Sequence, residues 1–188
     1  MKFCRNITEM IGHTPLLRLE QLAEGMEIYA KCEFMNPLSL KDRPVLQIIQ
    51  DAEESGQLKP GGTICGAGRY LKEKKPDVQL IAVEPRESPF ILQGIFRPQR
   101  MMGTAPGFVP ETLEREIIDE IHLVSEDEAF ETCRRIARME GLLVGISSGA
   151  TAIAAMQIAK REENAGKMIV CILADTGQRY LSVEGLFE

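Results

Sequence analysis

The chain has 188 residues, of which 44% are hydrophobic and 27% are charged, and this is an ordinary globular composition. A chain of this length buries roughly 70% of its unfolded surface when it folds, so we expect residues 1–188 to form a single domain with its own core. The 22 basic and 28 acidic residues give a net charge of −6, and tryptophan is absent. With no dense cluster of lysine and arginine and few aromatic side chains, the composition argues against a nucleic-acid-binding protein.

The N-terminal segment contains no long apolar run, which argues against a secretory signal peptide. No stretch of about 18 apolar residues is present, so no membrane-spanning helix is predicted. The cysteines are scattered and form no C-x-x-C pair, and this spacing argues against a disulfide framework and a zinc site; they are Cys4, Cys32, Cys65, Cys133 and Cys171. We therefore expect a cytoplasmic protein with free thiols and no metal.

The predicted elements alternate between strands and helices. A strand at 27–34 precedes a turn at 36–39, and the apolar spacing over 45–52 predicts a helix with Pro44 in its first turn. The later elements are, in chain order, a loop at 59–62, a helix at 68–74, a strand at 78–83, an irregular stretch at 86–110, a helix opened by the capping box Ser125/Glu128 and stopped at Gly141, a strand at 142–146, a helix at 149–160 and a strand at 168–173. The last three form a βαβ unit, which predicts an α/β fold with a parallel sheet.

The first candidate functional residue is Lys41, which follows a proline turn and stands at the beginning of a predicted helix. The positive end of a helix dipole disfavours a cation at this position, and desolvation would act in the same direction. Both effects favour the neutral amine that Schiff-base chemistry requires. The ordinary alternative is a solvated surface lysine.

A second candidate is the sequence G-I-S-S-G at 145–149, between a predicted strand and a predicted helix. As G-x-S-x-G it matches the nucleophile elbow of a hydrolase, but that order requires a histidine after the serine, and His13 and His122 both precede Ser147. As a serine–glycine turn at a helix N-terminus, it could bind an anion or a ring atom of a cofactor. A purely structural turn is the remaining alternative.

Two further loops are candidate ligand sites. The glycine-rich loop at 61–68 leads into a helix and could bind a phosphate through its backbone N–H groups, although it is not a dinucleotide-binding fingerprint. The turn at 175–180 follows the final predicted strand, and open parallel sheets bind ligands at the carboxyl ends of their strands. Each also has an ordinary explanation, as a surface loop and as a turn that ends a strand.

Six segments of the chain match the motifs of one known family, in the same order. They are I-G-H-T-P-L at 11–16, N-P-L-S-L-K-D-R at 36–43, G-A-G-R-Y-L-K-E-K-K-P at 66–76, A-V-E-P-R-E-S-P at 82–89, G-I-S-S-G-A at 145–150 and D-T-G-Q-R-Y-L-S at 175–182. Together they resemble the cysteine synthase (O-acetylserine sulfhydrylase) family, whose members are pyridoxal-phosphate (PLP) enzymes with the tryptophan-synthase-β-like fold. The resemblance implies an α/β protein, the three-layer parallel-sheet large domain of PLP fold type II, with the small domain largely missing.

The resemblance also implies roles for individual residues. Lys41 would bind PLP as a Schiff base and later act as the base at the substrate Cα, and Ser147 would hydrogen-bond the pyridine nitrogen. The residues that resemble the end of the family's phosphate loop are Gly61, Gly62 and Thr63. Gly103 resembles part of the loop that lines the substrate entrance.

The chain departs from the family pattern at several positions. It contains neither the T-S-G-N-T-G loop that binds the substrate carboxylate in this family nor the apolar strand that precedes the phosphate loop. Residues 56–64 resemble the family segment before the missing loop, and residues 61–76 resemble the phosphate loop and the helix after it. Residues 61–64 therefore fit both segments, which indicates an internal deletion with its junction near 60–65. Pro60 lacks an N–H group for phosphate, and segment 36–43 is one residue shorter than the family motif.

Two functions remain open from the sequence. One is PLP-dependent β-replacement, in which O-acetyl-L-serine and sulfide give L-cysteine and acetate. The other is a catalytically incompetent remnant or binding module of the same family. The resemblance further implies a homodimer and suggests serine acetyltransferase as a candidate partner. We expect no interaction with nucleic acid or membrane.

Overall fold

The computed structural model describes residues 4, 7–37, 40–43, 63–104, 107–109 and 113–186. The helix predicted from Pro44 onward and residues 60–62 of the predicted junction lie outside this part. The strands are β1 (Leu16–Arg18), β2 (Ile28–Lys31), β3 (Ile81–Pro85), β4 (Glu120–Val124) and β5 (Ile169–Ile172). The α-helices are α1 (Glu20–Ala23), α3 (Thr63–Lys74), α4 (Phe90–Gln93), α5 (Glu126–Glu140) and α6 (Ile146–Ala159). Short 3₁₀ helices are η1 (Ile7–Met10), η2 (Glu33–Met35), η3 (Arg115–Ile117), η4 (Glu162–Asn164) and η5 (Gly177–Tyr180).

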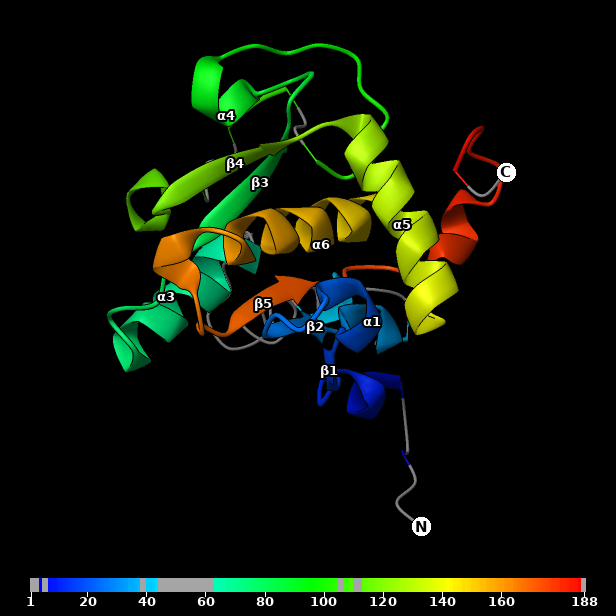
Figure 1. The fold of residues 1–188 in the computed structure, drawn as a ribbon, viewed down its shortest axis with the longest axis horizontal. Helices are drawn as coiled ribbons and strands as arrows, with labels where there is room; N and C mark the ends of the chain where they lie inside the picture. Colours follow the sequence, from blue (N-terminus) through cyan, green and yellow to red (C-terminus); the bar gives the residue numbers. More distant parts are fainter. Residues whose placement is uncertain are drawn as a thin grey trace, which may run out of the picture.

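The strands of the described residues form two separate sheets. In the first sheet, β2 lies between β1 and β5, antiparallel to β1 and parallel to β5, with Ala30 opposite Cys171. In the second sheet, β3 and β4 run parallel, with Val83 opposite His122. Helix α6 lies between the two sheets, and α5 runs beside it (Figure 1). The alternation of helices and strands and the two parallel pairings confirm the predicted α/β class.

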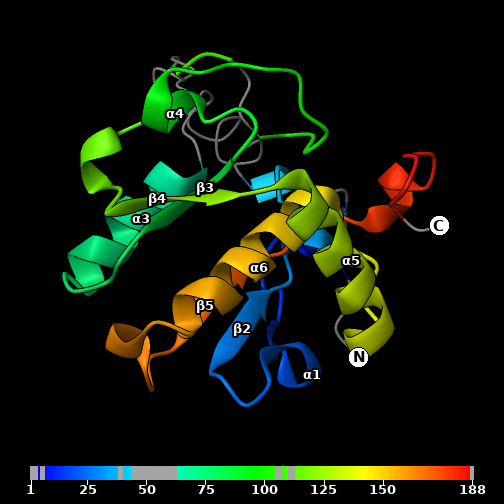
Figure 2. The same ribbon diagram turned by 45° about the horizontal axis from the view of Figure 1, so that its top comes forward.

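Helix α6 is the central packing element, because it carries small and apolar residues on both of its sides. Ala152 and Ala155 belong to the core that includes residues of β2 and β5, whereas Ala154 and Ile158 belong to a second core shared with α5. Helices α5 and α6 lie side by side (Figure 2). A Cβ atom at Gly149 would lie 2.2 Å from the carbonyl oxygen of Ala129, so only glycine permits this close approach.

The ends of α5 follow the sequence prediction. The Ser125 hydroxyl accepts a hydrogen bond from the Glu128 N–H at 3.3 Å, and the Glu128 carboxylate accepts one from the Ser125 N–H at 2.8 Å. Gly141 ends the helix with a φ of 69°, in the left-handed region that favours glycine. The predicted capping box and the predicted stop are both confirmed.

The predicted strand at 142–146 is wrong. Only Val144 pairs there, in a single bridge to Thr176, and α6 already begins at Ile146 rather than at 149. The reason is that the segment is tied to the turn after β5 rather than to a neighbouring strand, since the Gly145 N–H donates to the Asp175 oxygen at 3.1 Å. The chain then enters the helix, so no residues are left for a ladder.

Candidate cofactor site

The candidate site lies where the parallel strands β2 and β5 end. Because the two strands are parallel, their carboxyl ends meet at one edge of the sheet. The segment with Lys41 follows β2, and the residues that follow β5 contact the N-terminus of α6. Crevices at the carboxyl ends of parallel strands are the usual ligand sites of α/β proteins.

One residue, Ala174, joins the two segments that carry the predicted cofactor-binding residues. The Leu40 N–H donates to the Ala174 oxygen at 2.8 Å, and the Ala174 N–H donates to Ser148 Oγ at 3.0 Å. Lys41 is the next residue after Leu40, and Ser147 directly precedes Ser148. The structure therefore places Lys41 and Ser147 on the same edge of the molecule, although they are far apart in the sequence.

The two serines of the G-I-S-S-G segment have different environments. Ser148 is fully buried, and its hydroxyl is occupied by the Ala174 N–H. Ser147 is only half-buried, and none of the described residues forms a hydrogen bond with its hydroxyl. Of the two serines, Ser147 is therefore the one whose hydroxyl is not occupied by a described residue.

The other predicted site residues are placed in part. The Lys41 side chain is exposed, so the expected desolvation of its amine does not occur in this structure. Thr63 is the first residue of α3, while Gly61 and Gly62 lie outside the described residues. Gly103 is exposed in a turn with a φ of 85°, two residues after the buried Met101, which packs in the same core as Ile146.

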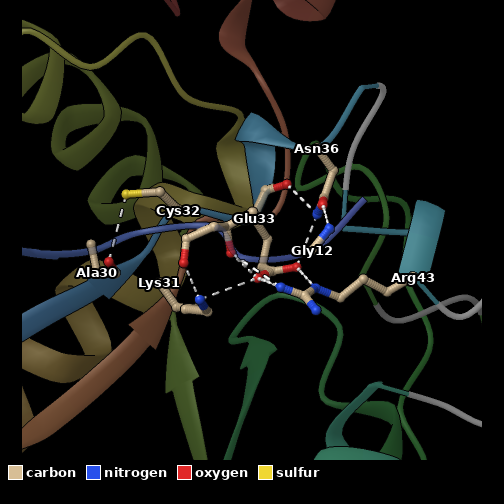
Figure 3. Close-up of polar contacts among 8 residues, drawn as sticks. Gly12, Ala30, Lys31, Cys32, Glu33, Asn36 and Arg43 are labelled. Carbon is tan, nitrogen blue, oxygen red and sulfur yellow. Dashed lines mark hydrogen bonds and ion pairs between the residues drawn. The ribbon is translucent and has the colours of Figure 1, made fainter. Parts of the chain in front are cut away.

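A polar cluster at the end of β2 was not identified from the sequence. In a strand over 27–34, successive side chains alternate between two faces, so Glu33 shares a face with Tyr29 and Lys31. A polar face of this kind usually meets solvent, but the Glu33 side chain is only 3% exposed. Figure 3 shows Glu33 between Arg43 and Asn36. The proximity of an acidic residue at a strand end to the K-D-R sequence of 41–43 is the one signal that could have indicated an ion pair here.

The Glu33 carboxylate is fully occupied by donors from three segments. Arg43 donates through Nε to Oε2 at 2.6 Å and through Nη2 to Oε1 at 3.1 Å. Thr14 Oγ1 donates to Oε1 at 2.5 Å, and Asn36 Nδ2 donates to Oε2 at 3.0 Å. Burial raises the pKa of Glu33, but the hydrogen bonds from these three side chains outweigh it and hold the pKa below its usual value.

A second set of polar contacts surrounds the N-terminus of α6. Tyr180 donates its hydroxyl proton to Asp175 Oδ2 at 2.5 Å, and burial followed by this carboxylate raises the pKa of the tyrosine. The Cys133 thiol donates to the Gly145 oxygen at 3.2 Å, and burial raises its pKa to about 12, so it is not a nucleophile near neutral pH. A Cβ atom at Gly145 would lie 2.1 Å from Asp175 Oδ1, which explains the glycine.

A family model described as pyridoxal-phosphate dependent enzyme matches residues 56–175 of the chain. The chain therefore belongs to this family of PLP-dependent enzymes. Within the family its relatives are the cysteine synthases, as the motifs predicted. A probable cysteine synthase of Bacillus subtilis is 47% identical over 124 residues, and a cysteine synthase of Staphylococcus aureus is 46% identical over 122 residues.

The length of the match is also informative. The similarity to the B. subtilis protein covers 66% of this chain but 40% of that protein, so the chain spans about two fifths of the length of the curated relatives it matches. Among solved structures, O-acetylserine sulfhydrylase isoform 3 of Entamoeba histolytica superposes with a TM-score of 0.90 at 24% identity, over 96% of this chain and 91% of that one. An O-ureido-L-serine synthase superposes with a TM-score of 0.89 at 25% identity, over 97% and 93%. The predicted PLP fold type II is confirmed, in a truncated form.

No helix in the described ranges is both long and apolar enough to cross a membrane. The same residues contain no group of three or more histidine, cysteine or acidic side chains that could hold a metal ion.

Proposed function

We propose that this chain binds PLP through Lys41 and catalyses a β-replacement of the cysteine synthase type, in which O-acetyl-L-serine and sulfide give L-cysteine and acetate. The observation that supports it is the shared contact of Leu40 and Ser148 with Ala174. This contact joins the backbone segment that contains Lys41 to the segment that contains Ser147, at one edge of the sheet. The family membership supplies the cofactor, and the relatives named as cysteine synthases suggest the reaction.

Each residue has a defined task in the proposal. PLP, when bound, supplies an electron sink that stabilises negative charge at the substrate Cα. Lys41 would hold the cofactor, and its amine would serve as the base for the Cα proton of the substrate. The Ser147 hydroxyl would donate to the ring nitrogen without bringing a charge.

The remaining cofactor contacts in the proposal are made by the segment that begins α3. Thr63 stands at the N-terminus of this helix, where backbone N–H groups and the helix dipole favour a phosphate. Gly61 and Gly62 would add further N–H groups, and Gly103 would lie on the substrate side. Proposed with these contacts are a homodimeric assembly and a cytoplasmic location, the latter in line with five cysteines that are all free thiols.

One feature favours a second function, in which the chain binds ligand without turnover. The sequence contains no T-S-G-N-T-G loop to orient the substrate carboxylate. Because orientation can contribute roughly 7 kcal/mol or more to lowering a barrier, its loss would slow the reaction by several orders of magnitude. Such a chain would act as a binding module, with serine acetyltransferase as the candidate partner.

Titration of the purified protein with PLP tests the proposal. We expect a visible absorption band that is fixed by borohydride reduction, and peptide mapping by mass spectrometry should place the label on Lys41. Lys41→Ala should remove the band. The matched control is Lys160→Ala, because Lys160 is an exposed lysine at the opposite end of α6 and should leave the band unchanged.

The two functions then differ in turnover. Formation of cysteine from O-acetylserine and sulfide by the PLP-loaded protein, lost in Lys41→Ala, would establish the enzyme. A Lys41-linked band without cysteine formation would establish the binding module instead. Absence of the band, or a label spread over surface lysines, would contradict the proposal altogether.

A further inference from the structure

We propose that Glu33 is a positioning residue that acts through Arg43 to hold the segment carrying Lys41 at the carboxyl end of β5. The inference rests on the proposed function in one respect, namely that Lys41 is the residue that binds PLP. It goes beyond that function because Glu33 itself does not bind the cofactor.

Glu33 places a negative charge in the interior of the protein. Glu33 is 3% exposed, and a carboxylate removed from water is strongly unfavourable unless it is paired and hydrogen-bonded. Here every donor comes from a segment outside β2: Arg43, Thr14 and Asn36. Arg43 is the charged partner at hydrogen-bonding distance, and Lys31 of β2 lies farther away, at 3.9 Å. Moving the segment of Arg43 away would therefore remove the close ion pair of a buried carboxylate, which is strongly unfavourable.

Lys41 lies between two residues, Leu40 and Arg43, that are each held by hydrogen bonds to another segment. On one side, the Leu40 N–H donates to the Ala174 oxygen at 2.8 Å. On the other side, Arg43 forms two hydrogen bonds with the Glu33 carboxylate, at 2.6 and 3.1 Å. A two-point contact of this kind fixes direction as well as distance. The backbone of Lys41 is therefore held on both sides, and the residue is exposed.

The loop that contains Gly12 is hydrogen-bonded to one of the residues that surround the ion pair. The Gly12 N–H donates to Asn36 Oδ1 at 2.8 Å, and the Asn36 amide in turn donates to Glu33 (Figure 3). Gly12 has a φ of 97°, and a Cβ atom at this position would lie 3.3 Å from Nη1 of Arg43. The glycine therefore leaves room for the guanidinium group.

Two variants and two measurements test the inference. Glu33→Gln removes the charge with little change in shape, and Arg43→Lys keeps the charge but cannot make the two-point contact. Hydrogen exchange measures whether the Leu40 amide stays protected. Titration with PLP measures the affinity of the protein for PLP. Because Arg43 is partly exposed, Arg43→Lys keeps the test decisive even if Glu33→Gln does not fold.

We expect the Leu40 amide to exchange about tenfold faster in Glu33→Gln, since a hydrogen bond to a charged group is lost, and PLP affinity to fall by a similar factor. Arg43→Lys should give smaller changes of the same sign. The matched control is Glu120→Gln, which breaks the two-point ion pair with Arg161 beyond the other end of α6, where both hydrogen bonds are 2.6 Å long. This control should change neither quantity.

The outcomes separate the positioning role from the proposed function. If the wild-type protein binds no PLP, the proposed function fails, and the exchange rate of the Leu40 amide alone decides whether Glu33 holds the segment. Unchanged exchange in both variants would overturn the inference. Fast exchange with undiminished PLP affinity would overturn it too, because Lys41 would then not need the anchor.

Discussion

The packing around α6 is closer at the N-terminus of the helix than further along it. At its N-terminus, around Gly145 and Gly149, neighbouring atoms come so close that no Cβ atom fits at either glycine. Further along the helix, a half-open pocket of about 110 Å³ lies between α6 and strands of the two sheets. Its lining comes from β3, α6 and β5: Ile81, Val83, Thr151, Ala154, Ala155, Ile158, Ile169, Val170, Cys171 and Ile172. The helix is thus packed closely at the candidate site and loosely between the sheets.

This difference shows where the truncation affects the molecule. Within the described part of the chain, β3 pairs only with β4, and β5 pairs only with β2, so each of the two strands that line the pocket has one unpaired edge. The sequence lacks the apolar strand expected before the phosphate loop, which agrees with the division of the strands into two sheets. The hydrogen bonds of Ala174 that join the segments of Lys41 and Ser147 lie outside this pocket.

The largest effect is expected at the closely packed end. Gly149→Ala would place a Cβ atom 2.2 Å from a backbone oxygen of α5, and a backbone atom cannot move aside as a flexible side chain can. We expect a loss of about 3 kcal/mol in the free energy of unfolding, measured by urea denaturation. Gly103→Ala is the control, because its Cβ would meet nothing within 4 Å and only the positive φ would oppose it, by about 1 kcal/mol. Equal losses in the two variants would contradict the close packing.

One substitution made at two positions of α6 tests the comparison directly. Ala155 lines the pocket, so the larger side chain of Ala155→Val should fill part of it and raise the free energy of unfolding by about 1 kcal/mol. Ala150→Val should lower it by about 1–3 kcal/mol, because Ala150 is buried in the second core directly after Gly149, where α5 approaches most closely, and added methyl groups would overpack this core. Both residues are buried alanines of the same helix, so helix propensity affects them alike. The same sign at both positions would end the distinction between the two regions.

The sequence predicted those features that depend on local signals. The capping box at Ser125 and the stop at Gly141 are set by neighbouring residues, and both are confirmed. The family and the fold class also followed from motifs and their order. The parallel pairing of β2 with β5 was not predicted, because the expected βαβ unit joined the strand at 168–173 to the segment at 142–146. The strand expected at 142–146 was wrong because its apolar residues serve the core without forming a ladder, which local alternation cannot distinguish.

The site was predicted only in part, because its geometry depends on contacts between distant segments. Nothing local reveals that Leu40 and Ser148 meet at Ala174. The burial of Glu33 was missed for the same reason, since strand alternation assigned it to the polar face and only Thr14, Asn36 and Arg43 together enclose it. A motif names the residues of a site, while the fold decides which of them are held in place.

The smallest effect is expected in the dependence of stability on pH. The carboxylate of Glu33 faces Arg43, Lys31, Thr14 and Asn36, and its pKa is lower in the folded state than in the unfolded chain. Its contribution to stability is therefore fully present above the unfolded pKa of about 4.3 and is lost as the pH falls through the lower, folded value.

Glu33→Gln should consequently flatten the acid limb of the unfolding free energy measured between about pH 5 and pH 2, because the variant has no proton to take up at this position. Arg43→Lys should keep part of the slope, since a cation still faces the carboxylate. Glu120 also has a lowered pKa, caused first by its hydrogen bonds from Arg161, so Glu120→Gln should flatten the limb as well. Only Glu33→Gln should do so together with faster exchange at Leu40. A flattened acid limb together with faster exchange at Leu40 would show that the buried carboxylate holds the segment of Lys41. A flattened limb with a Leu40 amide that stays protected would show that Glu33 contributes to stability but does not hold this segment.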